Sequence, residues 1–281
     1  MGRITVRRAV IRVTAGREPT RRIDTLAAEE PLEIRIAGTP LAVTMRTPGH
    51  DVELAAGFLV SEGVIAKADE FYSAIHCGGP GTGGEINDYN VLDVALAPGV
   101  RPPTPTVTRN FYTTSSCGIC GKASIDAVRT VSRFEVREDP VVVSAEQVAS
   151  FPERLRAEQS VFDKTGGLHA AALFDAATGE LLVLREDVGR HNAVDKVVGW
   201  ALLQRRLPLR GVVLQVSGRA SFELVQKAVT AGIPVLSAVS APSSLAAELA
   251  DEAGLTLLGF VRGDRLNIYS QPHRVRQEVR T

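Results

Sequence analysis

The chain has 281 residues, 44% of them hydrophobic and 23% charged, which is the composition of an ordinary globular protein with enough apolar side chains for a core. Its 32 basic and 32 acidic side chains cancel, so no overall field attracts nucleic acid or an anionic membrane, and we expect neither as a partner. No stretch approaches the roughly 20 apolar residues of a membrane-spanning helix, and no apolar secretory block follows the basic N-terminus. Three cysteines, an odd number, do not make a disulfide framework. Together these features predict a cytoplasmic protein.

The first part of the chain is rich in short β-branched runs that alternate with period two, as half-buried strands do. They cover residues 4–6, 9–14, 32–36 and 41–45. A turn at 47–51 then leads into a run with helical spacing that ends at Gly63, and residues 89–96 predict another strand. Residues 1 to about 108 therefore predict a β-rich α+β unit.

The second half alternates strands with helices. Residues 170–175 and 181–187 predict a hairpin with a glycine in its turn. Predicted helices over 194–203, 221–231 and 243–253 then alternate with predicted strands over 211–217, 234–239 and 256–261. Such crossovers favour a largely parallel sheet with helices on its faces. We place an α+β domain at 1–143, which ends in a mobile loop at about 109–122 and the helix after it, and an α/β domain at 144–281.

Ligands of open α/β sheets bind at the carboxyl ends of the strands, and this rule selects three segments. Ser217, Gly218 and Arg219 resemble an anion cradle, in which an arginine joins the backbone N–H groups of a helix N-terminus. Residues 240–244 follow the next strand. The last predicted strand ends in the run Phe260, Val261, Arg262, Gly263, Asp264 and Arg265. Its two arginines suit a pyrophosphate, and its acid suits a hydrogen bond to the edge of a guanine base. The alternative interpretation is a solvated turn.

The sharpest local signal is the pair Cys117 and Cys120, which glycines and Lys122 surround. Two thiols at this spacing suit a thiolate nucleophile with a resolving partner, half of a zinc site, or a thioredoxin-like oxidoreductase. Structural zinc is disfavoured because there is no second CxxC and the five histidines are scattered, so we expect no intrinsic metal. Cys77 stands alone beside a glycine-rich run and is typical of a structural or incidental cysteine.

Two further segments carry polar groups. His169 invites comparison with the His-x-Glu of zinc deaminases, but position 171 is alanine and no Pro-Cys-x-x-Cys follows, so we expect a partly buried histidine with satisfied hydrogen bonds. Residues 186–196 are unusually polar for a strand-to-helix junction. They fit either a ligand site, with His191 and Asn192 as contacts, or a structural cap with Asn192 at the helix start.

These motifs, in this order, resemble the formate dehydrogenase accessory sulfurtransferase family (FdhD). The resemblance covers nearly the whole chain and rests on motifs at 47–63, 116–122, 166–170, 186–196, 217–219, 240–242 and 259–263. It implies a homodimer whose C-terminal domain is a three-layer α/β unit similar to the cytidine-deaminase fold without its zinc.

The resemblance also implies a function. Members accept sulfur from a cysteine desulfurase as a persulfide and pass it to the molybdenum bis-guanine-dinucleotide cofactor, the bound substrate, for use by formate dehydrogenase. Carried over by position, Cys117 is the persulfide cysteine, Cys120 its partner, and residues 260–265 the cofactor-binding stretch. Contact by Gly218 and Arg219 is our own inference. The alternatives are a non-catalytic, cofactor-binding chaperone for formate dehydrogenase and a thiol-disulfide oxidoreductase.

Overall fold

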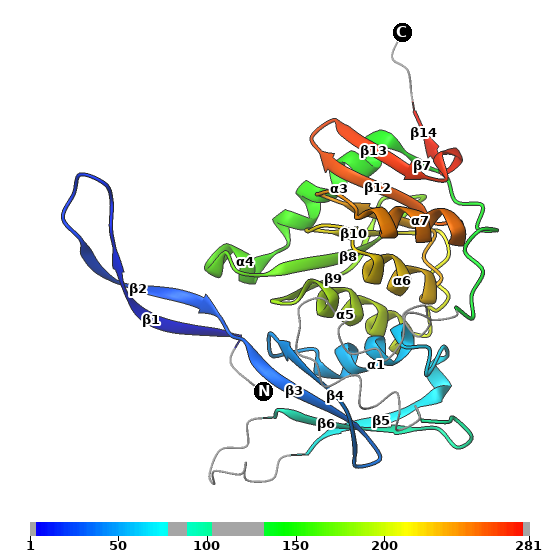
Figure 1. Ribbon diagram of the computed structural model, residues 1–281, viewed down its shortest axis with the longest axis horizontal. Coiled ribbons are helices and arrows are strands. Elements are labelled where there is room, and N and C mark those ends of the chain that lie inside the picture. Colours follow the sequence, from blue (N-terminus) through cyan, green and yellow to red (C-terminus); the bar gives the residue numbers. More distant parts are fainter. Residues whose placement is uncertain (1–3, 78–88, 103–131, 278–281) are drawn as a thin grey trace.

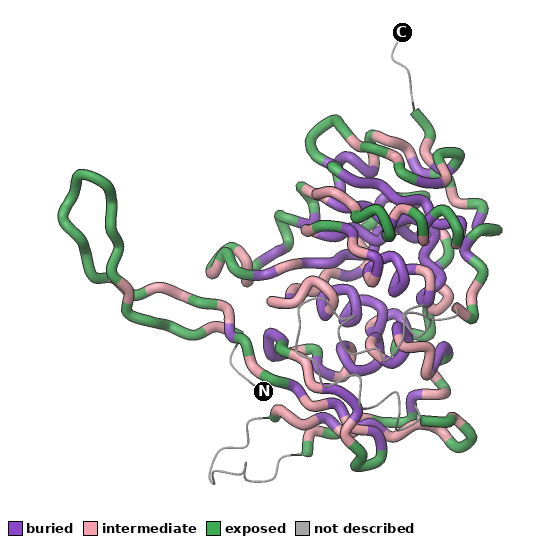
Figure 2. The backbone as a smooth tube through the Cα atoms, in the orientation of Figure 1, coloured by how far each residue is buried: buried purple, intermediate pink, exposed green. Residues whose placement is uncertain are grey.

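The computed structural model describes residues 4–77, 89–102 and 132–277. Figure 1 shows a projecting N-terminal arm, a small sheet at one end, a larger sheet at the other, and a layer of helices between the two sheets. Figure 2 shows that burial is concentrated in the larger sheet and in the helices beside it, whereas the arm is mostly exposed.

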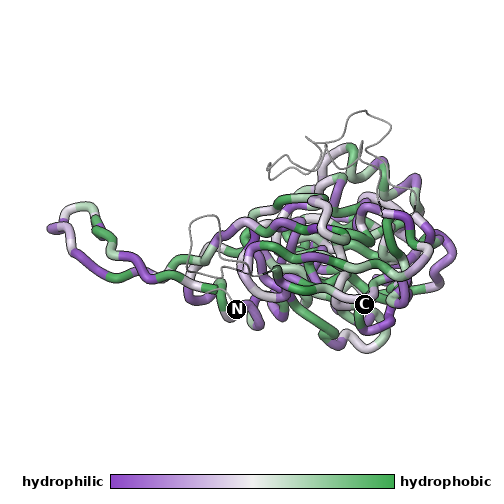
Figure 3. Tube along the Cα trace, turned by 90° about the horizontal axis from the view of Figure 1, so that it is seen from below, coloured by the Kyte–Doolittle hydropathy of each residue, from purple (hydrophilic) through white to green (hydrophobic). Residues whose placement is uncertain are grey.

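The arm is an antiparallel hairpin of β1 (Thr5–Arg12) and β2 (Thr20–Ala27). It projects from the body in both views, and polar and apolar residues follow one another along it (Figures 1 and 3). The sequence predicted two short strands at 4–6 and 9–14, and the structure joins them into one. It also adds β2, whose run of charged residues hid the strand pattern.

The smaller sheet has the order β4-β3-β6-β5. Its strands are β3 (Glu30–Ile36), β4 (Thr39–Arg46), β5 (Phe71–His76) and β6 (Val91–Leu96). Alternate residues of β3 and β6, such as Ile34 and Leu92, are fully buried in the same core as Leu54 and Leu59 of helix α1 (Asp51–Ser61). A 3-10 helix at Ala68–Glu70 leads into β5. The α+β character predicted for this half is confirmed.

The larger sheet is mixed, with the order β13-β12-β11-β10-β8-β9. Its strands are β8 (His169–Asp175), β9 (Leu181–Asp187), β10 (Val212–Val216), β11 (Val235–Ala238), β12 (Thr256–Arg262) and β13 (Arg265–Ser270). Only the β10–β11 and β11–β12 pairs are parallel, so the prediction of a largely parallel sheet was wrong. Three pairings are antiparallel: the hairpins β8–β9 and β12–β13, and the pairing of β8 with β10. The second hairpin was not foreseen.

Helices cover both faces of this sheet, which makes the C-terminal half a three-layer α/β unit as predicted (Figure 1). One face packs against α3 (Ala145–Ala157), which is followed by the short α4 (Ser160–Thr165). The other face packs against α5 (Arg190–Leu203), α6 (Phe222–Thr230) and α7 (Ser244–Ala253). A short parallel pair, β7 (Val143–Ser144) with β14 (Val275–Arg276), and a 3-10 helix at Pro272–Arg274 complete the described elements.

The two halves meet where α1 lies along α5 (Figure 1). Glycines allow the helices to touch backbone to backbone. A methyl group at Gly57 would lie 2.6 Å from the carbonyl carbon of Asp195, and one at Gly199 would lie 2.6 Å from that of Glu53. The predicted domain boundary at 143/144 falls inside β7 and stays a prediction.

Candidate functional site

A cavity of about 930 Å³ opens at the carboxyl edge of the three parallel strands. Ser217 follows β10, Val239 follows β11, Val261 and Arg262 end β12, and Gly263 follows it; all of them line the cavity. The opposite wall comes from α3, α4 and the segment that leads into β8. The volume is that of pockets that hold cofactors and other small molecules.

The predicted stretch 260–265 divides between the cavity and the surface. Val261, Arg262 and Gly263 line the cavity, and the Arg262 Nε donates a hydrogen bond to the Val239 carbonyl oxygen at 3.1 Å. Asp264 and Arg265 are almost fully exposed, because the chain turns there from β12 into β13. Phe260 is 43% exposed and has a left-handed φ of 53°.

The second predicted segment does not form the expected cradle at a helix N-terminus. Helix α6 begins only at Phe222, with Ser221 as its N-cap, so Gly218 and Arg219 precede it in a bend and irregular chain. Arg219 is exposed, whereas Gly218 lies behind the cavity-lining His169, whose Nδ1 is 3.4 Å from the place of a Cβ on that glycine.

The His169 side chain lines the cavity and is partly buried, as predicted, and its ring makes no hydrogen bond to another described residue. Partial burial, and then the nearby positive charge of Arg190 and His191, lower its pKa below the ordinary value. The imidazole is therefore neutral near pH 7 and offers the cavity one donor and one acceptor.

Sequence reasoning missed the opposite wall, which Leu155, Arg156, Gln159 and Phe162 build together with their neighbours. The Arg156 guanidinium lies over the Phe162 ring, 4.6 Å from its centroid, and pairs with Asp163 at 2.6 Å. The signals for helix α3 were the Ser144 N-cap and the spacing of Val148, Phe151 and Leu155, and Pro152 and many charges obscured them.

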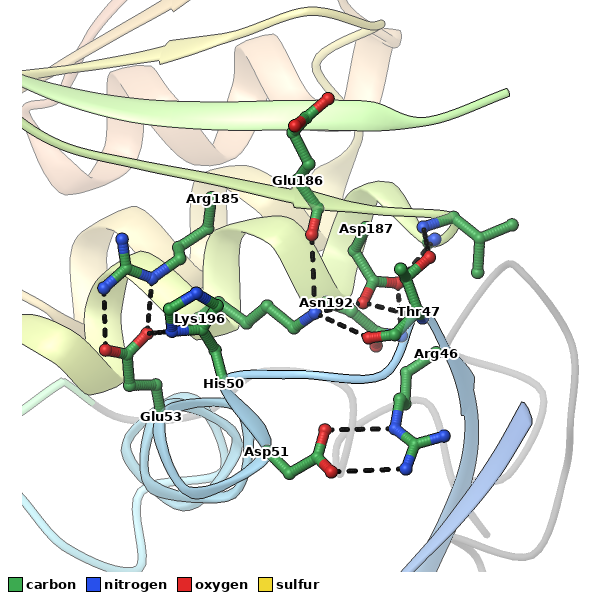
Figure 4. A network of polar contacts seen from close by, with 12 residues as sticks. Arg46, Thr47, His50, Asp51, Glu53, Arg185, Glu186, Asp187, Asn192 and Lys196 are labelled. Carbon is green, nitrogen blue, oxygen red and sulfur yellow. Dashed lines mark hydrogen bonds and ion pairs between the residues drawn. The ribbon is translucent and has the colours of Figure 1, made fainter. Parts of the chain in front are cut away.

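The polar motif at 186–196 forms a buried network at the junction of the two halves (Figure 4). Asp187 and Lys196 make an ion pair of 2.7 Å, and both side chains are almost wholly buried. The Asp187 carboxylate also accepts from the Thr47 and Gly189 backbone N–H groups, and Lys196 Nζ donates to the Thr47 carbonyl oxygen at 3.0 Å. Burial raises the pKa of Asp187, and these donors counter that effect.

This geometry favours the structural interpretation of the motif. Helix α5 has Gly189, not Asn192, at its N-cap; Asn192 instead donates to the Met45 carbonyl oxygen at 2.8 Å. His191 pairs with Glu223 at 2.7 Å. Neither His191 nor Asn192 lines the cavity.

A second set of polar contacts, one ion pair and one hydrogen bond to a buried ion pair, holds α1 to the C-terminal half. Arg185 contacts both carboxylate oxygens of Glu53, and Lys227 contacts both of Asp195, which also accepts from Ser61 (Figure 4 shows the Glu53 pair). Burial raises the pKa of Glu53, but Arg185 and His50 overcome that effect and lower it to about 2. Glu53 is therefore ionised throughout the physiological range.

Cys117 and Cys120 lie outside the described residues, so their roles stay predictions. Cys77 is a free, exposed thiol. Within 4–77, 89–102 and 132–277, no group of three or more His, Cys, Asp or Glu side chains is arranged to hold a metal ion. Across the same ranges, no helix combines the length and the apolarity that crossing a membrane requires.

The fold and the cavity define an α/β protein with a ligand-sized pocket at the ends of its parallel strands. Residues 27–276 match the model of the FdhD/NarQ family, and the chain belongs to that family. It is 63% identical to a protein of Streptomyces avermitilis named sulfur carrier protein FdhD, over 98% of this chain and 97% of the relative. A Mycobacterium tuberculosis protein of the same name is 58% identical, over 98% and 100% of the two chains.

The fold also has a counterpart among solved structures. A crystal structure described as a putative formate dehydrogenase accessory protein from Desulfotalea psychrophila superposes with a TM-score of 0.77. The two chains are 24% identical, and the superposition covers 98% of this chain and 100% of the other.

Proposed function

We propose that this protein is a sulfur carrier that serves the maturation of formate dehydrogenase, with Cys117 as the carrier residue. The observation that carries the proposal is full-length similarity to relatives named sulfur carrier proteins, in a chain that has the Cys117 and Cys120 pair. This chemistry requires reduced thiols, which supports the cytoplasm as the compartment in the proposal.

In the proposed reaction, the Cys117 thiolate attacks the terminal sulfur of the persulfide on a cysteine desulfurase. The S–S bond of the donor breaks, the donor cysteine leaves as a thiolate, and Cys117 becomes a persulfide. The terminal sulfur then passes to the metal centre of the substrate. In one version, the Cys120 thiolate attacks the inner sulfur of the Cys117 persulfide, the outer sulfur leaves as hydrosulfide, and a Cys117–Cys120 disulfide remains. In the other, Cys120 only favours the thiolate form of Cys117, and a small-molecule thiol makes the same attack, supplies the two electrons and leaves a mixed disulfide on Cys117.

The substrate that receives the sulfur is, in this proposal, the molybdenum bis-guanine-dinucleotide cofactor. Support comes from the cavity, because Val261, Arg262 and Gly263 line it and are part of the stretch that the family uses for the cofactor. Arg262 supplies a cation to a phosphate group at the rim. A two-fold homodimer provides one such cavity for each of the two nucleotides.

Intact-protein mass spectrometry after incubation with a cysteine desulfurase and cysteine tests the carrier chemistry. We expect a reducible gain of one sulfur atom, about 32 Da, in the wild type and in Cys120→Ala, and no gain in Cys117→Ala. Sulfur-free wild-type protein would refute the carrier role and favour a chaperone that only holds the cofactor. Insulin reduction that needs both cysteines would instead indicate a thiol-disulfide oxidoreductase.

A further inference from the structure

The arm formed by β1 and β2 projects from the body and exposes apolar side chains (Figures 1 and 2). Ile11, Val13 and Ile23 are 64%, 72% and 54% exposed. The register pairs Ile23 with Ala9 and Ile11 with Arg21, so Ile11 and Ile23 are diagonal neighbours on one face of the hairpin. Since a two-stranded hairpin gains little stability by itself, an apolar face of this kind suits contact with another molecule.

The charges of the arm are mostly arginines. Residues 4–27 contain six arginines, no lysine and two acids, which is a net charge of +4 in a chain whose total is zero. Arg22 pairs with Asp24 at 3.5 Å, and no other arginine of the arm has an ion-pair partner among the described residues. Arginine forms bidentate hydrogen bonds with carboxylates and is enriched in protein interfaces, where lysine is depleted. The arm therefore fits a surface that has carboxylates around an apolar centre.

Two other kinds of anionic partner fit the arm less well. Residues 4–27 contain no Phe, Tyr or Trp. Proteins bind single-stranded nucleic acid with aromatic side chains on which the bases stack, and aromatic side chains also anchor proteins at the membrane surface. The composition of the arm therefore favours an acidic protein over a nucleic acid or an anionic lipid surface.

The base of the arm is attached to the wall of the cavity. β2 packs against α4, and a Cβ at Gly167 would lie 3.8 Å from the Ala27 Cβ. Gly167 lines the cavity together with Phe162 of α4. The Glu186 carboxylate accepts from the Val161 and Phe162 backbone N–H groups at 3.0 and 2.8 Å, which fixes α4 to β9. A protein held by the arm therefore lies on the side of the molecule where α4 lines the cavity (Figure 1).

We propose that the arm docks the enzyme that receives the cofactor, the formate dehydrogenase of the proposed function, through an acidic surface with an apolar centre. The inference rests on that proposed function, in which the cavity holds the cofactor, and it adds the surface that holds the client. The position of the arm favours the client over the sulfur donor, because the client has to reach the cavity and the donor has to reach Cys117.

Biolayer interferometry of the full-length protein with cofactor-free formate dehydrogenase from the same organism tests the inference. Arg7→Glu combined with Arg21→Glu reverses two exposed charges on the face that carries Ile11 and Ile23. We expect the dissociation constant to rise about tenfold in this arm variant, and the salt dependence of binding to become weaker than in the wild type. Ile11→Ser combined with Ile23→Ser keeps the charge and should also weaken binding severalfold.

A matched control carries the same change of net charge at two exposed arginines outside the arm and the cavity lining, Arg101→Glu and Arg210→Glu. Its dissociation constant should stay within about twofold of the wild type. Circular dichroism and the sulfur gain on Cys117 should be unchanged in the arm variants, because the arm takes no part in the sulfur chemistry. A loss confined to the arm variants supports the docking surface.

The outcomes separate the inference from the proposed function. Equal affinities of the wild type and the arm variants, or wild-type protein that gains sulfur without binding the enzyme, would overturn the docking surface alone. Loss of binding to the cysteine desulfurase in place of the client, or a smaller assembly of the arm variants in size-exclusion chromatography, would also overturn it and would identify the donor or a second copy of the chain as the occupant. Wild-type protein that gains no sulfur but binds the enzyme through the arm would refute the carrier role and keep the docking surface.

Discussion

The contact between α1 and α5 should be intolerant of a single added methyl group at either of two glycines. In Gly57→Ala the new Cβ would lie 2.6 Å from the carbonyl carbon of Asp195, whereas ordinary contact begins at 3.4 Å. The Asp195 carbonyl oxygen would lie closer still, so the helices would have to separate by about 1.5 Å along a buried interface, which would lose a substantial part of its dispersion energy. Alanine normally stabilises a helix interior by about 1 kcal/mol relative to glycine, so this gain opposes the clash. We expect a net destabilisation of about 3 kcal/mol.

Urea unfolding followed by far-ultraviolet circular dichroism measures this loss, and Gly199→Ala on the facing helix should show a similar one. Gly167→Ala is the matched control, because its Cβ would have its nearest neighbour 3.8 Å away and its φ is not left-handed. That control should lie within about 0.5 kcal/mol of the wild type. If Gly57→Ala and Gly199→Ala are as stable as the control, the close approach of the two helices is wrong.

Three further measurements examine the junction between the halves. Lys196→Met should cost about 3 kcal/mol in urea, because it leaves the Asp187 carboxylate buried and unpaired, and adding Asp187→Asn should recover part of that loss. Glu53→Gln should lower the free energy of unfolding by about 1 kcal/mol at pH 7, after allowance for solvent screening. The pKa of Glu53 in the folded protein is lowered to about 2, so this difference in stability from the wild type is fully present above pH 4.5 and disappears as the pH falls through 2. Fluorescence of Trp200, the single tryptophan, and circular dichroism should report one shared unfolding transition, and two separated midpoints would contradict the coupling of the halves.

The sequence predicted the elements whose residues are buried on a regular period. Val212–Val216 reads as a buried strand because helices cover both of its faces, and α5, α6 and α7 carry apolar residues at helical spacing. The elements that were missed are exposed or short of apolar residues, such as β2 and β13. Their pairing partners, not their own composition, hold them in the sheet.

The candidate site was predictable only on its strand side. Topology places Val261 to Gly263 at a carboxyl edge, and this rule needs only the order of strands and helices. No such rule predicts that helix α3 forms the other wall of the cavity, because the packing of Phe151 and Leu155 on the sheet decides where that helix lies. The direction of residues 217–219 also depends on where α6 begins, which local sequence does not determine to within two or three residues.

The polar residues of the central strands show why a pattern alone could not separate scaffold from site. Gln215 and Ser237 interrupt apolar strands, as Asp187 and Lys196 interrupt the β9–α5 junction, and all four are buried. The junction pair satisfies itself and its neighbours, so its burial needs no ligand. Gln215 and Ser237 are wholly buried, and each keeps one side-chain atom without a hydrogen-bond partner among the described residues. Since burial of an unpaired polar atom opposes folding, the complete hydrogen-bond network of Asp187 and Lys196 favours a structural role for that pair.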